Sequence, residues 1–273
     1  MNAPSLVPRR PLGKSGKLVS VVGLGTVKLG RDSGVKYPVV IPDDEAAGAL
    51  LDRAEQLGLN LLDTAPAYGR SEERLGQLLQ GRRERWFVVT KAGEEWDGGC
   101  STFAFGFRDV GASIERSRER LRTGHIDCVL LHSDGIAEQT PEGFEQGAQA
   151  ILNAKRRGEV GLVGASVKTH QGARLAMSWA DVLMLEFVEG DTQMEAIAAE
   201  CARRGLGILA KKALGSGQLR GNGGAGAAVA RVLGIEGVSS VIVGTTNPAH
   251  LAENCEAASR AVDELGAVSE NGA

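Results

Sequence analysis

The stretch Leu51–Asp63, LDRAEQLGLNLLD, joins a polar and apolar helical pattern to a short apolar run through one glycine. Glycine just past the end of a helix readily takes the left-handed backbone conformation that ends it. The run after Gly58 is too short and too continuously apolar for an amphipathic helix, so it indicates a buried strand. The same joint recurs where LNAKRRG leads into EVGLVGAS and where AECARRG leads into LGILAK. The chain is therefore built from repeated helix-to-strand units.

Counting every such apolar run predicts eight strands. They are expected near residues 20–24, 59–63, 86–91, 126–132, 160–166, 182–186, 206–210 and 239–243. Near-continuous apolar strands that alternate with helices must be buried on both faces, as in a parallel sheet. We therefore predict an α/β fold, a (β/α)8 TIM barrel, with a doubly wound open sheet as the alternative. The segment PLGKSGKLVSVVGLG (11–25) predicts an N-terminal β-hairpin that covers the amino-terminal face of the barrel.

Length and composition limit the classes of protein that fit. A chain of 273 residues with 42% hydrophobic content can bury a large core, and barrels of about 250 residues are routinely single domains. We expect one domain over residues 1–273. The 31 basic and 34 acidic residues are scattered in mixed sign, without the clustered cationic face that nucleic acid requires. The sequence therefore predicts no nucleic-acid partner.

The sequence also disfavours a membrane protein, a zinc-binding protein and a disulfide-linked protein. No apolar stretch approaches the roughly 20 residues that span a bilayer, and the N-terminal residues lack the apolar core of a signal peptide. We expect a cytoplasmic protein without a membrane partner. The four cysteines lie far apart with no CxxC pair, so neither a zinc site nor a disulfide framework is predicted.

Four reactive side chains fall where predicted strands end. Asp63 and Tyr68 lie in GLNLLDTAPAYGRSEERLG (58–76), Lys91 closes WFVVTK, and His132 closes IDCVLLH. The carboxyl ends of barrel strands meet at one rim, and neighbouring strands are about 4.8 Å apart. These four side chains are therefore predicted to form one catalytic cluster.

The chemistry of this cluster suits proton transfer to a carbonyl oxygen. A phenol has a pKa near 10, and a neighbouring ammonium lowers that pKa because it favours the phenolate. Lys91 is expected to be that ammonium, with Asp63 as its counter-ion. Tyr68 can then act as the general acid while hydride arrives at the carbon, and His132 is expected to hold the carbonyl oxygen.

Several motifs, in order and over almost the whole chain, resemble those of the aldo-keto reductase family. They are the 58–76 segment, VVTK (88–91), LLHSD (130–134) and VIVGTTNPAHLAEN (241–254). The resemblance implies an eight-stranded (β/α) barrel that binds a nicotinamide cofactor across its rim. It implies reduction of small aldehydes or ketones without a metal, with the reverse oxidation also open. The family's tetrad corresponds to Asp63, Tyr68, Lys91 and His132, with Tyr68 as the proton donor.

The resemblance also assigns the nicotinamide contacts. Gly25 and Thr26 correspond to the first-strand contacts, and Ser166 to a ligand of the carboxamide group. Met184 stands where the family usually has glutamine, and Lys211 stands where it has an aromatic residue that stacks on the nicotinamide. Val167 also replaces a usual asparagine, so the pocket departs from the family pattern at three positions.

The remaining cofactor contacts follow from two later segments. The pyrophosphate is expected to lie against Leu214, Gly215, Ser216 and Gly217. Small residues in this segment let backbone N–H groups approach an anion. The adenosine phosphate is expected at the start of the last helix, against Thr245, Thr246, Glu253 and Asn254. Gly244 and His250 stand where many relatives have a lysine and an arginine for the 2′-phosphate. The resemblance favours NADP(H), with NAD(H) as the alternative.

Two other function classes are open on the sequence alone. A lysine at a strand end can attack a carbonyl when its pKa is lowered, so Lys91 could serve a Schiff-base lyase. The three departures in the nicotinamide pocket also fit a non-catalytic redox sensor on the same scaffold. No long apolar helix face is left over, which predicts a monomer or weak homo-oligomer.

Overall fold

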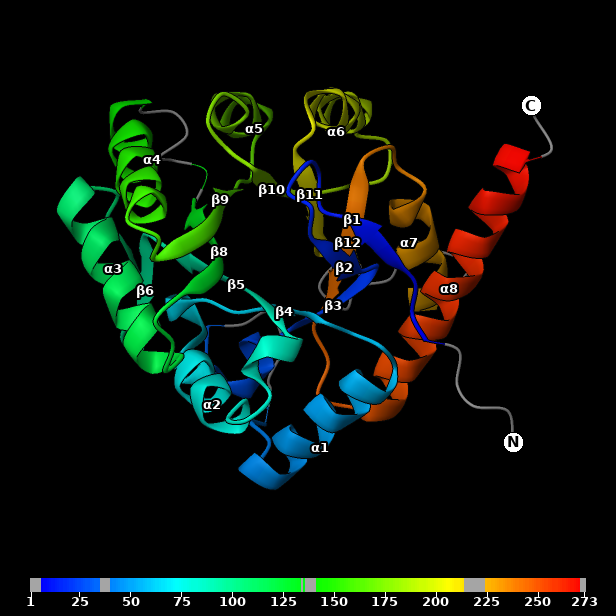
Figure 1. The fold of residues 1–273 in the computed structure, drawn as a ribbon, viewed down its shortest axis with the longest axis horizontal. Coiled ribbons are helices and arrows are strands. Elements are labelled where there is room, and N and C mark those ends of the chain that lie inside the picture. Colours follow the sequence, from blue (N-terminus) through cyan, green and yellow to red (C-terminus); the bar gives the residue numbers. More distant parts are fainter. Residues whose placement is uncertain (1–5, 35–39, 134, 136–140, 214–223, 271–273) are drawn as a thin grey trace.

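The computed structural model describes residues 6–34, 40–133, 135, 141–213 and 224–270 (Figure 1). Eight parallel strands close into a barrel. In chain order they are β3 (Val22–Gly25), β4 (Leu61–Asp63), β5 (Phe87–Ala92), β8 (Ile126–His132), β9 (Val160–Ser166), β10 (Val182–Glu186), β11 (Gly207–Lys211) and β12 (Val238–Val243). The last strand pairs with the first through Val241 and Val22. This closure confirms the predicted TIM barrel and excludes the open doubly wound sheet.

A ring of helices surrounds these strands, as Figure 1 shows. They are α1 (Asp44–Gln56), α2 (Ser71–Leu78), α3 (Phe107–Arg120), α4 (Pro141–Arg156), α5 (His170–Ala176), α6 (Thr192–Arg204), α7 (Gly224–Leu233) and α8 (Pro248–Glu270). Their ends follow local rules: the Asp43 carboxylate accepts a hydrogen bond from Ala46 N at the start of α1, and Gly205 ends α6 with φ +82°. Shorter elements are the 3₁₀ turns η1 (Val27–Leu29), η2 (Pro66–Tyr68) and η3 (Arg83–Arg85) and the hairpin β6 (Glu94–Trp96) and β7 (Ser101–Phe103).

The predicted N-terminal hairpin is present as β1 (Arg9–Pro11) paired with β2 (Leu18–Ser20). Leu12 lies in the turn between these two strands, is fully buried and packs into the hydrophobic cluster inside the barrel. The Ser239 hydroxyl, at the start of β12, donates to Pro11 O at 2.9 Å. Lys14 N donates to Gly205 O, just before β11, at 2.8 Å. The hairpin therefore closes the end of the barrel at which the strands begin.

Two predicted strands begin two residues later than the apolar pattern suggested. Residues 18–20 belong to the hairpin, so the first barrel strand begins at Val22 and not at Ser20. The second begins at Leu61, because the Asn60 side chain is used to hold the hairpin. Its Oδ1 accepts from Ser20 N at 2.7 Å and its Nδ2 donates to Leu18 O at 2.9 Å.

The core has two parts, as expected for a barrel covered by helices. One cluster fills the barrel interior and includes Leu61, Val89, Leu130, Met184 and Leu209. A second, larger cluster lies between the outer faces of the strands and the helices. This double burial explains why the strands read as continuous apolar runs.

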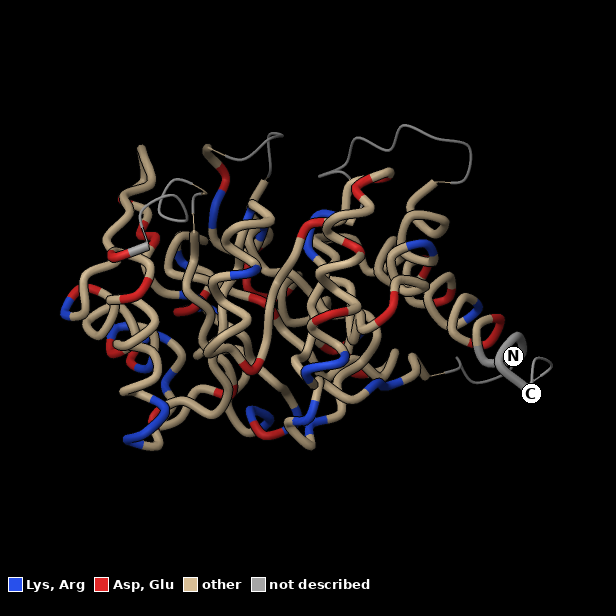
Figure 2. Tube along the Cα trace, turned by 90° about the horizontal axis from the view of Figure 1, so that it is seen from above, with Lys and Arg blue, Asp and Glu red and all other residues tan. Residues whose placement is uncertain are grey.

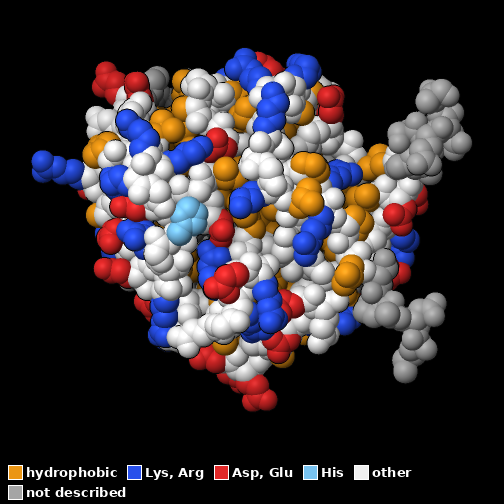
Figure 3. Space-filling model, viewed as in Figure 1, with side chains coloured by type: hydrophobic (Ala, Val, Ile, Leu, Met, Phe, Trp, Pro, Cys, Tyr) orange, Lys and Arg blue, Asp and Glu red, His pale blue; other side chains and the backbone are white. Residues whose placement is uncertain are grey.

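Charged residues of both signs are interspersed along the chain (Figure 2). On the face shown in Figure 3, cationic and anionic side chains are likewise intermixed with hydrophobic ones. None of the helices within the described ranges is long and apolar enough to cross a membrane.

Candidate active site

The structure brings the four predicted catalytic side chains to one rim. Asp63 ends β4, Lys91 lies in β5 and His132 ends β8, on three neighbouring strands, while Tyr68 ends η2. The Lys91 amine donates to Asp63 Oδ1 at 2.5 Å, to Thr64 O at 2.9 Å and to Tyr68 OH at 3.1 Å. The Tyr68 hydroxyl also donates to Asp63 Oδ2 at 3.4 Å. A buried acid, a buried amine and a half-buried phenol therefore form one hydrogen-bonded cluster.

Two glycines fix the turn that carries Tyr68. Gly69 has φ +60°, and a Cβ there would overlap the carbonyl oxygen of Gly30. A Cβ on Gly30 would in turn overlap Tyr68 O and Ser71 N. Arg70 N donates to Gly30 O at 3.2 Å across this crossing. The loop after β3 and the loop after β4 thus pass at a distance that only glycine permits.

The structure corrects the predicted acidity of the phenol. Burial above all, and then the charge of Asp63, raises the pKa of Tyr68 to about 12, although Lys91 acts to lower it. Burial opposes charge on Lys91, but the attraction of Asp63 and of Tyr68 outweighs it and raises the pKa of Lys91. The prediction of a lowered phenol pKa was wrong because burial and the negative charge of Asp63 outweigh the lowering effect of Lys91.

His132 lies beside Tyr68, with ring centroids 6.3 Å apart and planes at 84°. Its Nδ1 is 2.9 Å from Oε2 of Glu94 on β6, an ion-pair distance at which the ring N–H is not aligned as a hydrogen bond. The Ser101 hydroxyl donates to the other Glu94 oxygen at 2.6 Å. Burial lowers the pKa of His132 to about 4, against the opposing effect of Glu94, so the ring is neutral at pH 7.

Glu94 is a residue that the sequence interpretation missed. Burial opposes its charge, but His132, the Ser101 hydroxyl and Arg31 lower its pKa to about 2. Arg31 itself stacks on the Trp96 ring, 3.6 Å from the centroid, and donates to Ala67 O at 2.9 Å. Glu94 belongs to a hairpin after β5, not to a strand end, so the strand-end rule gave no signal for it. Its position three residues after Lys91 was the available sequence clue.

The predicted nicotinamide contacts lie on three adjacent strands. Ser166 ends β9, Met184 lies in β10 and is paired with it, and Lys211 ends β11. The Lys211 amine donates to the Ser166 hydroxyl at 2.9 Å. Burial, followed by repulsion from neighbouring lysines, lowers the pKa of Lys211 to about 7. One of the three family departures, Lys211, thus places a weakly basic amine where the resemblance implies an aromatic ring.

The two predicted first-strand contacts, Gly25 and Thr26, differ in whether they are available to a cofactor. Gly25 ends β3, but the hydroxyl of Thr26 is used inside the protein. It donates to Asp63 O at 2.9 Å and accepts from the Ser71 hydroxyl at 2.7 Å. Thr26 is also fully buried. We therefore expect Thr26 to support the catalytic loop and not to bind cofactor through its side chain.

The predicted adenosine site gathers at the start of α8. Gly244, His250 and Glu253 are exposed and Thr246 is half-buried, while the Thr245 hydroxyl accepts from Asn247 N at 3.0 Å. The Asn254 amide donates to His250 O at 2.7 Å, and its buried Oδ1 has no partner among the described residues. A buried acceptor without a partner fits a donor such as the adenine amino group. The predicted pyrophosphate residues Leu214, Gly215, Ser216 and Gly217 lie outside the described residues.

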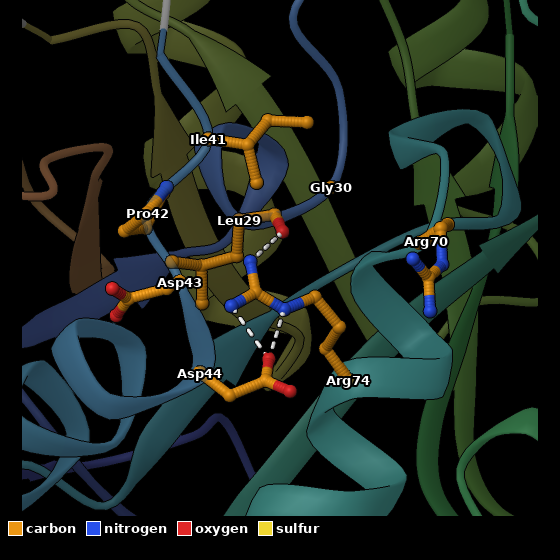
Figure 4. A pocket seen from close by; sticks show the side chains of 8 residues that line it. All are labelled: Leu29, Gly30, Ile41, Pro42, Asp43, Asp44, Arg70 and Arg74. Atoms are coloured by element: carbon orange, nitrogen blue, oxygen red, sulfur yellow. Dashed lines mark hydrogen bonds and ion pairs between the residues drawn. The ribbon is translucent and has the colours of Figure 1, made fainter.

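A separate hollow of about 310 Å³ is lined by residues of η1, the start of α1 and α2. Figure 4 shows Arg74 at its floor, paired with Asp44 at 2.7 Å and donating to Leu29 O at 2.6 Å. None of the four predicted catalytic residues lines it. Its arginine is already paired, so we assign the chemistry to the strand-end cluster.

Comparison with known proteins agrees with this architecture. The sequence profile described as "Aldo/keto reductase family" matches residues 21–232. This chain belongs to the aldo/keto reductase family. A solved structure from Pseudomonas aeruginosa, assigned to the aldo-keto reductases, is 42% identical with a TM-score of 0.85, covering 95% of this chain and 98% of that one. The holo form of an aldo-keto reductase from Bacillus halodurans has a TM-score of 0.77 over 92% of this chain and 90% of that one; at 20% identity it shows likeness of fold.

Curated relatives of this family member are more distant. An uncharacterized oxidoreductase of Bacillus subtilis is 33% identical over 58% of this chain and 48% of its own length. The L-galactose dehydrogenase of Arabidopsis thaliana is 29% identical over 78% of this chain and 67% of its own length. The chain thus spans about half to two thirds of the length of these curated relatives.

Proposed function

We propose that this aldo/keto reductase family member reduces aldehydes or ketones with a nicotinamide cofactor and that Tyr68 is the proton donor. The observation that supports the proposal is the contact of Tyr68 OH with the Lys91 amine at 3.1 Å, beside Asp63. NADP(H) is the cofactor that we propose first, with NAD(H) as the alternative. The substrate is a small carbonyl compound, and the reverse oxidation uses the same groups.

The raised pKa of Tyr68 suits a donor, because the hydroxyl keeps its proton at neutral pH. Lys91 remains charged and lies where it stabilises the oxygen that the proton leaves. A bound reduced nicotinamide supplies the hydride. His132, oriented by Glu94, lies beside Tyr68 and is proposed to position the reacting oxygen.

The residues present fit such a cofactor in part. Asn254 offers its unpartnered acceptor, and Ser166 a buried hydroxyl. Ser166, Met184 and Lys211 are proposed to border the nicotinamide, and Gly25 to approach it through its backbone. Thr245, Thr246 and Glu253 are proposed for the adenosine half, together with Gly244 and His250.

The Schiff-base alternative at Lys91 is disfavoured by the same geometry. A Schiff base requires a neutral amine, whereas Lys91 is held as an ammonium by Asp63 at 2.5 Å. The redox-sensor alternative shares the cofactor site and differs only in turnover. The three departures from the family pattern around Ser166 are the observation that supports the redox-sensor alternative.

Tyr68→Phe tests the proposal. We first titrate purified wild type and variant with NADPH and with NADH by fluorescence, and then measure turnover of an aldehyde panel. The variant should keep cofactor binding and lose reduction by roughly 10²- to 10⁴-fold, the usual contribution of a general acid. Undiminished turnover in the variant excludes Tyr68 as donor, while wild type that binds cofactor without turnover favours the sensor.

A further inference from the structure

A second amine, distinct from Lys91, faces the same barrel rim. Lys211 ends β11, and its Nζ reaches across the end of β10 to the Ser166 hydroxyl on β9 at 2.9 Å. The residue is partly exposed to solvent. Lys211 therefore combines partial exposure with a side-chain position fixed by a hydrogen bond.

The contacts of Lys211 differ from those of an ordinary protein lysine. Within the ranges that the structure describes, no carboxylate lies within ion-pair distance of its Nζ, and its hydrogen bond goes to a neutral hydroxyl. The nearest acid on β10, Glu186, is engaged at 2.8 Å by the neighbouring Lys212. Ammonium groups of Lys212, Lys91 and Lys168 repel a further positive charge at this point.

These surroundings favour the neutral amine. Burial comes first, repulsion by the lysines follows, Glu186 opposes them, and the pKa of Lys211 falls to about 7. His132, which also faces this amine, is neutral at pH 7 because its own pKa is lowered to about 4. Lys91 is the contrast within the same rim, because Asp63 holds it charged. A far larger fraction of the Lys211 amine than of an ordinary lysine is thus unprotonated at neutral pH.

We propose that Lys211 captures aldehydes at the barrel rim as a Schiff base. The amine donates one N–H to Ser166, so its lone pair is free to attack the aldehyde carbon and form a carbinolamine. The nitrogen then loses a proton, the carbinolamine oxygen gains one, the C–O bond breaks and water leaves as the C=N bond forms. No electrons are exchanged, so this step needs no cofactor and goes beyond the proposed reduction.

Reductive alkylation by propionaldehyde tests the capture without any nicotinamide. The full chain is incubated with propionaldehyde and cyanoborohydride at several pH values, and alkylated lysines are located by peptide mass spectrometry. An ordinary lysine with pKa near 10.4 is unprotonated in only about one molecule in two thousand at pH 7. Lys211 should therefore be alkylated at least about tenfold faster than Lys212, its exposed neighbour, with a rate that levels off above pH about 7.

Variants separate this site from general surface labelling. Lys211→Met and Lys211→Arg should remove the fast site, whereas Lys212→Met should keep it. The comparison of the two lysines within the wild-type protein does not depend on how the variants fold. Equal rates at Lys211 and Lys212, or a fast site at another lysine, would overturn the proposal. Because NADPH is absent, neither result bears on reduction by Tyr68.

Discussion

Glu94 Oε2 lies 2.9 Å from His132 Nδ1, so a carboxylate from the β6 hairpin faces the ring of a residue that ends β8. A nitrogen lone pair 2.9 Å from a carboxylate oxygen is repelled by its charge, and a proton on Nδ1 replaces this repulsion with attraction even though the N–H is not aligned as a hydrogen bond. The neutral ring is therefore expected to carry its proton on Nδ1, which leaves Nε2 as an acceptor. Glu94 is thus proposed as a positioning residue for His132.

Glu94→Gln should change the pKa and the tautomer of His132. Without the carboxylate, the influence that raises the pKa of His132 is lost, so that pKa should fall further and the proton should distribute between the two nitrogens. Nitrogen NMR of labelled histidine reads the tautomer directly. Turnover should fall roughly tenfold from lost orientation. Glu95→Gln is the matched control, since Glu95 binds Arg116 at 2.6 Å on the other side of the hairpin; an unchanged tautomer in Glu94→Gln contradicts the positioning role.

Asp63→Asn should destabilise the fold as well as the site. Removing one partner of a buried ion pair costs about 3 to 5 kcal/mol, and Lys91 is fully buried. Urea unfolding at pH 7 measures this loss. Adding Lys91→Met to the variant should restore much of it, because no unpaired ammonium is then left. A double variant less stable than Asp63→Asn alone would speak against this account.

The same pair gives a pH dependence with a definite sign. The pKa of Lys91 is raised in the folded protein, so its stabilisation is complete below the unfolded-state value near 10.4 and is lost as pH rises through the folded value. The difference in unfolding free energy between wild type and Asp63→Asn should stay constant from about pH 6 to 9. It should shrink above about pH 10, and a difference that instead shrinks as pH falls from about 9 to 6 would contradict the assignment.

His250→Arg should sharpen the preference for NADPH. His250 is exposed at the start of α8, where an arginine can bind a 2′-phosphate through charge-assisted hydrogen bonds. We expect the ratio of NADH to NADPH dissociation constants to rise about tenfold, equivalent to about 1.4 kcal/mol. The exposed His125 provides the control variant His125→Arg. Equal tightening of both cofactors would place the 2′-phosphate elsewhere.

Asn254→Ala should weaken binding of the adenosine half alone. The lost Oδ1 is the buried acceptor that has no partner within the described part of the chain. Losing a hydrogen bond of about 1 kcal/mol raises a dissociation constant roughly fivefold. Titration with NADPH should show this change, while reduced nicotinamide mononucleotide, which lacks adenine, should bind as it does to wild type. Equal weakening of both ligands would mean that the substitution disturbed the whole rim.

The barrel and the convergence at its rim could be predicted from the sequence because both follow from strand ends. Continuous apolar runs marked the strands, and Asp63, Lys91 and His132 came last in theirs or next to last. The acidity of Tyr68 could not be predicted in the same way. It depends on the burial of the phenol and on the balance between the opposing charges of Asp63 and Lys91, which the order of residues does not reveal.

Contacts made by hairpins and by long side chains could not be predicted from the sequence either. Glu94 meets His132 only because β6 folds back over the rim, and Lys211 meets Ser166 only because its side chain crosses a whole strand. The sequence did show that lysine replaces an aromatic residue at position 211. The effect of that replacement on the pKa of the amine could be determined only from the residues that surround Lys211 in the structure.

The crossing of Gly30 and Gly69 sets where this enzyme scaffold can be altered. Neither position accepts even a methyl group without moving backbone, so randomised libraries that include them will mostly yield inactive protein. The tip of the β6 hairpin is exposed around Cys100, and a Cβ on Gly99 there would make only ordinary contact with the Asp97 carboxylate. Changes of substrate range should therefore be sought by diversifying Gly99 and Cys100, with Glu94 and the segment bearing the phenol left intact.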